Sequence, residues 1–294
     1  MAENSKIEWT DHTFNPWIGC MKVSDGCKNC YAEQLMDKRY GKVEWGPQGI
    51  RLRTSAANWK LPFKWNRLAK ENKTRARVFC ASLADVFEDR PELEQWRMDL
   101  FQLIDLTPNL DWLLLTKRPE NVKDMLVRAG RGFQPLPDWV WLGTSVENQA
   151  AADERIPELL KIPARVRFLS MEPLLGPVDL NQWLLSEHGR RAIGAMPGIS
   201  WVIVGGESGP QARPMHPDWA RSIRDQCQAA GVPFFFKQWG EYAPDCFCQN
   251  DKPHVMVPRP APGKMGGMFR CGKHAAGRLL DGVEHNNFPQ AVRA

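Results

Sequence analysis

The sequence has no apolar run that approaches the ~18 residues needed for a membrane-spanning helix. Its amino-terminal end lacks the basic segment followed by an apolar stretch that marks a secretory signal peptide. Low-complexity tracts are missing as well. We therefore expect a cytoplasmic protein that does not contact a membrane.

The composition is that of an ordinary soluble domain, with 43% hydrophobic and 25% charged residues. Its 294 residues can form one large domain, or one domain with an appendage. The chain contains eight cysteines, which are not expected to form a disulfide framework in a reducing compartment.

Positive charge is concentrated in one segment, although the net charge of the whole chain is only +5. Residues 38–77 contain twelve Lys or Arg and two acidic residues, a net charge of +10, so the rest of the chain carries −5. Such an asymmetry indicates an anionic partner for this segment.

Short apolar runs recur about every thirty residues from residue 78 onward, a spacing that suits one strand, one helix and two loops. The runs are Val78–Ala81, Trp112–Leu115, Val140–Gly143, Val166–Leu169, Trp201–Val204 and Val232–Phe236. Helical apolar stripes fit between them at 92–106 and 217–230. Near-continuous apolar strands that alternate with helices predict a parallel sheet buried on both faces.

Each predicted strand is followed by polar side chains that are capable of chemistry. These ends are 82–85, 116–118, 145–148, 170–173, 205–208 and 237–239. Polar residues at the carboxyl ends of parallel strands are typical of a barrel whose active site lies at that rim. With an earlier strand at 14–19, the pattern predicts an α/β fold, a (β/α) barrel of the TIM type, partial or complete. A doubly wound sheet is the alternative, because spacing does not separate the two.

Two segments interrupt the repeat. Residues 31–77 form a basic insertion, rich in Trp and Pro, between the first two strands. Residues 241–294 contain many Gly and Pro and little regular patterning. We therefore predict a barrel domain over residues 1–240, which includes the insertion, and an appendage over residues 241–294 that packs on the barrel.

Three cysteines lie close together near the amino-terminal end. Cys20, Cys27 and Cys30 have the spacing C-x6-C-x2-C, and the C-x2-C pair allows two sulfurs to converge on one metal centre. Zinc usually takes four protein ligands, whereas a cubane iron–sulfur cluster on three thiolates leaves one iron open for a cofactor. The motif favours the cluster, and a zinc site completed by a distant cysteine is the alternative.

The segment Gly19–Ala32 resembles the signature of a phage-associated family with three cysteines, catalogued without a function. The likeness covers nearly the whole chain and includes Ser145–Gln149, Met171–Pro177, Gly205–Gly209, Ala212–Pro214, Phe235–Gly240 and Gly277–Gly282. That family is in turn similar to the radical S-adenosylmethionine enzymes, which place a cluster after the first strand of a partial barrel. The common spacing in those enzymes is C-x3-C-x2-C, and an aromatic residue stands where this chain has Asn29.

The resemblance implies a radical enzyme. A [4Fe-4S] cluster on Cys20, Cys27 and Cys30 would bind S-adenosylmethionine, and an electron from flavodoxin or ferredoxin would release a 5′-deoxyadenosyl radical. Because the family is phage-associated, the implied substrate is a base of phage DNA, modified in the cytoplasm of the host. The most specific expectation is an isomerase that rearranges an amino-acid adduct on thymidine.

S-adenosylmethionine needs polar partners for its amino, carboxylate and ribose groups. We expect Gly205, Gly206 and Glu207 to approach this cofactor, because glycine permits close backbone contact and the acid can hold an amino group or a ribose. A tight turn with a solvated acid is the alternative. Four further strand-end residues are candidates for the cofactor site, namely Ser82, Asp85, Ser145 and Glu147.

Glu172, Lys117 and Lys237 are the candidates for catalysis. Glu172 precedes Pro173 at a strand end, where a helix cannot follow at once, and it can act as an acid or a base. Lys117 and Lys237 lie at two other strand ends and favour an anionic substrate. The alternative role for all three is in ion pairs between rim side chains.

The basic segment suits nucleic acid, because cations contact phosphates and aromatic rings stack on bases. Its aromatic residues are Tyr40, Trp45, Trp59, Phe63 and Trp65. Arg51, Arg53, Lys60 and Lys64 are the expected phosphate contacts. A solvated basic face, fixed to the barrel by its Trp residues, is the alternative.

Cys246, Cys248, Cys271 and His274 are candidates for a second metal site, although the C-x-C spacing suits a zinc knuckle poorly. The sequence leaves two classes of function open. One is the radical enzyme on a nucleic-acid base. The other is a nucleic-acid-binding protein in which a zinc or iron–sulfur site is structural and nothing is catalysed.

Overall fold

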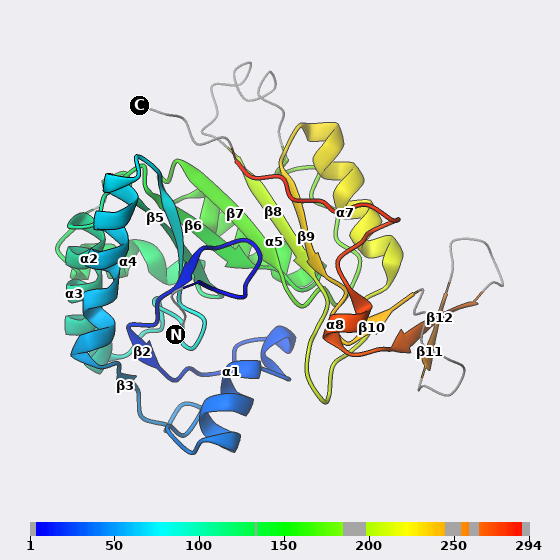
Figure 1. Cartoon of the computed structure of the whole chain (residues 1–294), viewed down its shortest axis with the longest axis horizontal. Helices are drawn as coiled ribbons and strands as arrows, with labels where there is room; N and C mark the ends of the chain where they lie inside the picture. Colours follow the sequence, from blue (N-terminus) through cyan, green and yellow to red (C-terminus); the bar gives the residue numbers. More distant parts are fainter. Residues whose placement is uncertain (1–3, 133, 185–197, 245–253, 259–264, 290–294) are drawn as a thin grey trace. The chain divides into compact units, whose positions relative to one another are not determined.

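A parallel sheet of seven strands is the main element of the protein (Figure 1). The computed structural model describes residues 4–132, 134–184, 198–244, 254–258 and 265–289. The strand order is β1-β4-β5-β6-β7-β8-β9. A doubly wound sheet would reverse its order at a switch point, and this order does not reverse. The predicted α/β fold is confirmed in its partial (β/α) barrel form, since β1 and β9 are the two ends of an open order.

The strands of this sheet are short. They are β1 (His12–Thr13), β4 (Ala76–Cys80), β5 (Leu110–Thr116), β6 (Val140–Ser145), β7 (Val166–Met171), β8 (Trp201–Gly205) and β9 (Phe234–Gln238). Parallel registers pair Val78 with Trp112 and Phe168 with Trp201, among others. All six apolar runs predicted from the sequence overlap strands of this sheet.

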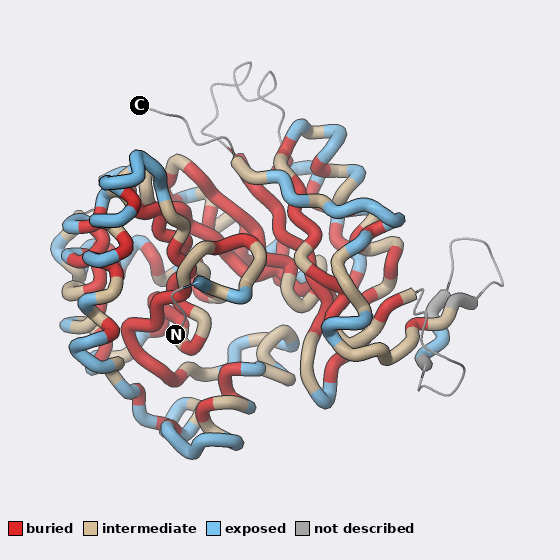
Figure 2. The backbone as a smooth tube through the Cα atoms, viewed as in Figure 1, coloured by how far each residue is buried: buried red, intermediate tan, exposed pale blue. Residues whose placement is uncertain are grey.

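The strands are apolar along their length because both faces of the sheet are covered. Leu113 and Leu114 point to opposite faces of β5, yet neither is exposed to solvent. Figure 2 shows the same continuous burial along the other central strands. Burial on both faces is the reason that these strands lack an alternating pattern.

The first strand differs from the prediction, which placed it at 14–19. Strand β1 ends at Thr13, and one more ladder bond follows, from the Phe14 N–H to the Phe79 carbonyl at 2.9 Å. Pro16 then interrupts the ladder, because proline has no backbone N–H to donate. The next strand, β2 (Trp17–Ile18), pairs instead with β3 (Leu52–Arg53) in an antiparallel ribbon outside the sheet.

Helices occupy the connections. The α-helices are α1 (Tyr31–Glu33), α2 (Ala56–Glu71), α3 (Glu94–Asp105), α4 (Val122–Arg128), α5 (Gln149–Leu160), α7 (Pro217–Ala230) and α8 (Lys273–Ala276). Short 3-10 helices are η1 (Asp25–Cys27), η3 (Pro91–Leu93) and η4 (Pro119–Asn121), and η2 (Gln34–Arg39) is a π-helix. In the described ranges, none of these helices has the length and apolarity needed to cross a bilayer.

Helix α7 coincides with the helix predicted at 217–230, and its ends follow from the sequence. Pro217 opens the helix, and His216 Nδ1 accepts the Asp218 N–H at 3.1 Å. Gly231 ends it with a left-handed φ of 67°, which glycine adopts without strain. The other predicted helix, at 92–106, is formed by η3 and α3.

The chain divides into two compact units. Unit 1 comprises Met1–Thr144 and Pro157–Arg167, and unit 2 comprises Ser145–Ile156 and Phe168–Ala294. Within unit 1, α2 packs on β4 and β5, and within unit 2, α7 packs on β8 and β9. The expected boundary at residue 240 stays a prediction.

The described residues beyond 240 contain more regular structure than the sequence suggested. Strands β10 (Tyr242–Ala243), β12 (Met265–Arg270) and β11 (His254–Pro258) form an antiparallel sheet in that order. After α8 the chain runs back to β8 and β9. There the Phe236 N–H donates to the His285 carbonyl at 2.9 Å, and Trp201 Nε1 donates to the Asn287 carbonyl at 2.8 Å.

Replacement of a core leucine tests the buried sheet. We expect Leu113→Ala to lower the free energy of unfolding by about 2–5 kcal/mol, because it leaves a cavity in the packed core. Leu106→Ala, at a leucine that is 64% exposed, should change it by less than about 0.5 kcal/mol. Urea unfolding followed by circular dichroism measures both, and equal losses would contradict this core.

Candidate functional site

The three candidate cysteines lie on one loop of unit 1, between β2 and α1. Helix η1 positions Cys27, and Cys30 comes directly before the first residue of α1. Cys20 and these two residues are free thiols and are half-buried. Tyr31 fastens the end of the loop, because its hydroxyl donates to the Ser82 carbonyl at 2.7 Å.

The start of this loop lies beside the segment that follows β4. Gly19 forms a parallel bridge with Ala84, which brings Cys20 alongside that segment. The φ of Gly19 is +113°, and a Cβ there would lie 2.9 Å from the Arg51 side chain. Glycine is therefore required immediately before the first cysteine.

The carboxylate of Asp85 joins two strand ends of unit 1. Its Oδ1 accepts the Thr116 hydroxyl at 2.7 Å and the Phe87 N–H at 3.0 Å. Its Oδ2 accepts the Lys117 N–H at 3.0 Å and Nη1 of Arg118 at 2.8 Å. One buried carboxylate thus ties the segment after β4 to the end of β5.

Arg118 connects this carboxylate to the cysteine loop. Its Nη1 also lies 3.8 Å from Cys20 Sγ in hydrogen-bonding geometry, and its Nη2 donates to the Met21 carbonyl at 2.8 Å. Burial lowers the pKa of Arg118, but Asp85 and Cys20 raise that pKa by more. The guanidinium therefore stays charged beside the thiol.

Burial opposes ionisation of two thiols of the loop. The pKa of Cys20 is raised to about 12, chiefly by burial and also by Asp85, while Arg118 acts to lower it. Burial also raises the pKa of Cys30, and Lys117 is a cation that lowers it. Cations are thus found near both ends of the loop, where they favour thiolates.

The donor chemistry of the loop fits an iron–sulfur cluster, because such clusters are bound by cysteine thiolates. The loop carries three free thiols of this kind, with Arg118 and Lys117 nearby. The three sulfurs are not gathered as a metal-binding group, since no three His, Cys, Asp or Glu side chains among the described residues are.

Two of the four candidates for a second metal site lie among the described residues. Cys246 and Cys248 lie outside the described residues. Cys271 is half-buried after β12 and is disulfide-bonded, so it does not offer a free thiol, and His274 is exposed on α8. The second site stays a prediction.

In unit 2, Glu172 and Lys237 form an ion pair beside the ends of β7 and β9. Lys237 Nζ lies 2.9 Å from Glu172 Oε1, with side chains 16% and 14% exposed. The Ser170 hydroxyl lies 3.4 Å from Glu172 Oε2. A Cβ on Gly205 would come within 2.5 Å of Glu172 Oε1, so glycine leaves the space for this pair. The structure therefore brings together two of the three catalytic candidates.

Gly206 and Glu207 lie in a tightly packed turn after β8. A Cβ on Gly206 would collide with the Trp239 carbonyl oxygen. The carboxylate of Glu207 is buried and accepts from Arg213 through Nε at 2.9 Å, Nη2 at 2.6 Å and the backbone N–H at 2.8 Å. These contacts favour the structural alternative, a tight turn, although the acid is buried rather than solvated.

The remaining cofactor candidates also take part in the local fold. Glu147 is buried and accepts Nη1 of Arg155 at 2.9 Å, and the same Nη1 donates to the Ser145 carbonyl at 2.9 Å. The hydroxyl of Ser82 accepts from the side-chain amide of Asn15 at 3.0 Å. Their roles toward a cofactor stay predictions.

Sequence reasoning selected these acids but missed two of their partners. Arg155 follows Glu147 by eight residues, and Arg213 follows Glu207 by six. An arginine shortly after each strand-end acid was the available signal. No such signal was available for the contact between Asn15 and Ser82, because these residues are 67 positions apart.

Arg51, one of the four predicted phosphate contacts, lies in a buried ion pair. Its Nε and Nη2 lie 2.8 Å and 2.6 Å from the two carboxylate oxygens of Glu88, and both side chains are 0% exposed. Its Nη1 donates to the Gly49 carbonyl at 2.8 Å. This burial disfavours a phosphate contact, and Arg51 fixes the insertion to the segment after β4.

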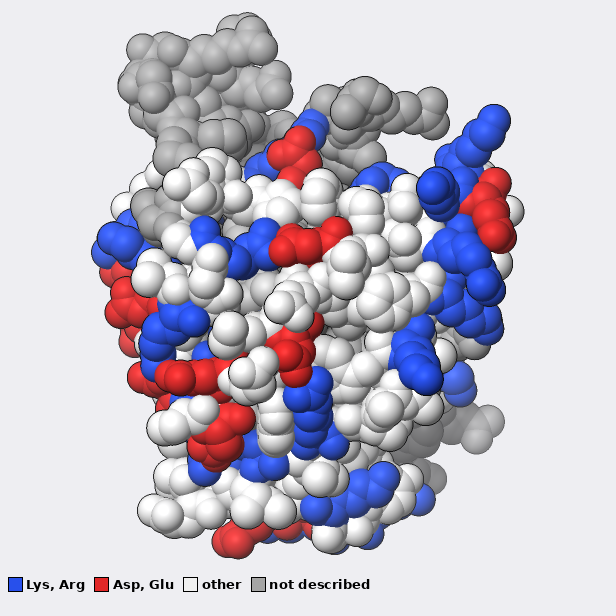
Figure 3. Space-filling view, turned by 90° about the vertical axis from the view of Figure 1, so that its left-hand side faces the viewer, with Lys and Arg blue, Asp and Glu red and all other residues white. Residues whose placement is uncertain are grey.

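The other three predicted phosphate contacts are closer to the surface. Arg53 pairs with Asp99 at 2.6 Å and lies over the Trp59 ring at 4.4 Å. Lys60 and Lys64 are exposed on α2. Figure 3 views the side that carries α2, α3 and α4, and Lys and Arg side chains gather along one edge of that face.

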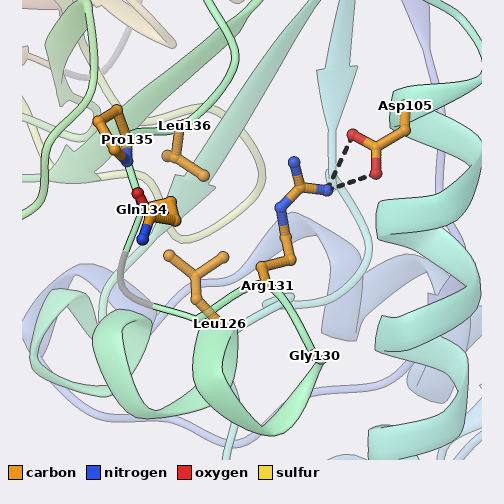
Figure 4. A pocket seen from close by; sticks show the side chains of 7 residues that line it. All are labelled: Asp105, Leu126, Gly130, Arg131, Gln134, Pro135 and Leu136. Carbon is orange, nitrogen blue, oxygen red and sulfur yellow. Dashed lines mark hydrogen bonds and ion pairs between the residues drawn. The ribbon is translucent and has the colours of Figure 1, made fainter.

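A pocket of unit 1 is lined by no residue of the cysteine loop (Figure 4). It is lined by Asp105, Leu126, Gly130, Arg131, Gln134, Pro135 and Leu136. Asp105 already holds the arginine, with Nη1 of Arg131 at 2.7 Å and 2.9 Å from its oxygens. The lining comes from segments that precede β5 and β6, and this amino end of the strands is not where barrels carry chemistry.

The buried pair of the insertion makes a prediction for stability. Glu88→Gln should lower the free energy of unfolding by about 3–5 kcal/mol, because it leaves the Arg51 charge buried without a counter-charge. Asp138→Asn removes an exposed pair with Arg165 and should cost less than about 1 kcal/mol. Urea unfolding compares the two variants, and similar losses would refute the buried pair.

Comparisons with known proteins give a family but no activity. Searches of curated proteins and of solved structures gave no match to this chain. One family profile matches residues 4–289, nearly the whole length. The chain therefore belongs to the family described as protein of unknown function (DUF5131).

Proposed function

We propose that this chain is a radical S-adenosylmethionine enzyme that modifies a nucleic-acid base. The observation that carries the proposal is the loop of Cys20, Cys27 and Cys30, which presents free thiols beside strand ends of a parallel sheet. Three thiolates bind a [4Fe-4S] cluster and leave one iron open for the cofactor. A partial (β/α) barrel is the fold expected for such an enzyme.

The surroundings of the loop support a negatively charged cluster. Arg118 lies against Cys20, and Lys117 lowers the pKa of Cys30. Asp85 holds both cationic residues in place, through the backbone of Lys117 and the side chain of Arg118. Charge and hydrogen bonding around the sulfurs are the means by which a protein adjusts such a cluster.

When bound, the cluster and S-adenosylmethionine supply a 5′-deoxyadenosyl radical, with the electron delivered by a donor such as flavodoxin or ferredoxin. The chain's own residues bind and orient the substrate. Lys237 and Lys117 are cations near strand ends that can hold an anionic group. Glu172, paired with Lys237, can accept or return a proton during the rearrangement.

Helix α2 supports a nucleic-acid substrate. Four cations, Lys60, Lys64, Arg67 and Lys70, are exposed on it, and Glu71 is its one acid. Lys60, Lys64 and Arg67 have the spacing of one helix face. Such a face contacts phosphates and positions the strand, while the base itself must be single-stranded or flipped out to be modified. A thymidine in phage DNA that carries an amino-acid adduct is the substrate implied by the resemblance.

A nucleic-acid-binding protein with a structural metal is the second candidate. It is supported by the same basic helix, and by the engagement of Glu147 and Glu207 in buried ion pairs. The two candidates differ in whether the metal reacts with S-adenosylmethionine.

Anaerobic reconstitution with iron and sulfide separates the two candidates. We expect about four iron ions per chain and reductant-dependent release of 5′-deoxyadenosine from S-adenosylmethionine. Replacement of Cys20, Cys27 or Cys30 by Ala should abolish both, because each thiol is a ligand. Iron analysis, electron paramagnetic resonance and chromatography of the nucleoside provide the measurements.

Two buried free thiols elsewhere provide the matched controls. Cys80→Ala and Cys227→Ala should retain the cluster and the nucleoside product, because these residues lie in the hydrophobic core. A colourless protein that binds zinc through the three cysteines and leaves S-adenosylmethionine intact would establish the structural alternative.

Charge reversal on α2 tests the nucleic-acid partner. Lys60→Glu with Lys64→Glu should weaken binding of single-stranded DNA and reduce the slope of log K against log salt by about 0.7 for each lost contact. Fluorescence anisotropy at several salt concentrations measures the slope. The control reverses two cations outside α2, Lys161→Glu with Arg165→Glu, and should keep the wild-type slope. Equal slopes in all three proteins would remove α2 from the binding surface.

A further inference from the structure

We propose that Arg118 is a positioning residue of the cluster site, which orients the Cys20 thiolate and shields it from the Asp85 carboxylate. The inference rests on the proposed function and assigns a role to a residue that does not ligate the metal. Its consequence is that Arg118 raises the reduction potential of the bound cluster.

The guanidinium of Arg118 is fixed on three sides. Nη1 is shared between Asp85 Oδ2 at 2.8 Å and Cys20 Sγ at 3.8 Å, and Nη2 donates to the Met21 carbonyl at 2.8 Å. The backbone N–H of Arg118 donates to the Thr116 hydroxyl at 2.9 Å, which itself donates to Asp85. The side chain cannot turn away from Cys20 without breaking these bonds.

Burial strengthens the electrostatic effect of Arg118 and Asp85 on the Cys20 sulfur. The side chains of Arg118 and Asp85 are 6% and 8% exposed, so water screens them weakly. The nearby acid Glu88 is neutralised by its own pair with Arg51. Asp85 is therefore the acid against which Arg118 must protect the thiolate of Cys20.

The reduction of a thiolate-bound cluster adds one negative charge. A cation and an N–H···S hydrogen bond beside the ligand stabilise the reduced form, whereas an unpaired carboxylate destabilises it. Loss of Arg118 would remove the cation and the hydrogen bond, and it would leave the Asp85 carboxylate unpaired. Loss of the Asp85 charge would leave the guanidinium without a counter-charge, with the opposite effect on the potential.

Redox titration of reconstituted protein, followed by electron paramagnetic resonance, tests this pair of effects. The midpoint potential should fall in Arg118→Met, rise in Asp85→Asn and return toward the wild-type value in the double variant. Arg118→Lys should show a smaller fall in midpoint potential than Arg118→Met, because lysine keeps the charge but not the planar guanidinium with its several donors. If Arg118 and Asp85 had a role in local folding alone, the midpoint potentials of the two single variants would not shift in opposite directions.

The wild-type protein separates failure of the proposed function from failure of this inference. A wild-type chain that takes up no cluster would refute the proposed function. A loaded wild-type chain with the same potential as loaded Arg118→Met would overturn the role of Arg118 and leave the function standing. Folded Arg118→Met that does not retain the cluster would support the role in orienting Cys20.

Two further variants complete the design. Arg75→Met breaks a pair with Asp111 at the opposite end of β4 and should leave the potential unchanged. If Arg118→Met does not fold, as judged by circular dichroism, Arg118→Gln replaces it, because glutamine keeps donors without the charge. Its potential should also fall, and an unchanged value would overturn the inference.

Discussion

Four acidic side chains near the strand ends are buried, and each is held by the guanidinium of an arginine. The pairs are Asp85 with Arg118, Glu88 with Arg51, Glu147 with Arg155 and Glu207 with Arg213. A buried carboxylate is costly without a counter-charge, and the arginine fork supplies several donors in a fixed plane. The loops that follow the strands are therefore held by ion pairs as much as by apolar packing, and the candidate sites lie on these loops.

The same pairing changes the meaning of the basic segment. Five cations of residues 38–77 pair with acids outside the segment, so five of its ten net positive charges have a counter-charge in the chain. They are Lys38, Arg51, Arg53, Arg75 and Arg77. Lysine is the more strongly hydrated cation and stays at the surface, which is where Lys60 and Lys64 lie. The electrostatic case for nucleic acid thus rests on helix α2 and not on the composition of the whole segment.

Most of the sheet could be predicted because parallel strands buried on both faces leave continuous apolar runs, as in Trp112–Leu115. The first strand could not, because Pro16 breaks the ladder within a segment whose apolar residues look like one strand. The burial of Arg51 could not be predicted from the sequence, for another reason. Charge and spacing report which residues are cations, but burial depends on a partner 37 positions away, which local patterns do not reveal. The cysteine motif could be recognised in the sequence because its three cysteines lie within eleven residues of one another.

Of the four buried pairs, Asp85–Arg118 is distinguished by a contact between its arginine and a sulfur atom. Arg51 and Arg155 use theirs on backbone carbonyls, at Gly49 and Ser145 respectively. Arg118 reaches the Cys20 sulfur with the same Nη1 that binds the carboxylate. A single nitrogen therefore serves both the junction of two strand ends and the cysteine loop. Because the strand junction fixes that nitrogen, the fold itself holds the Cys20 sulfur in place.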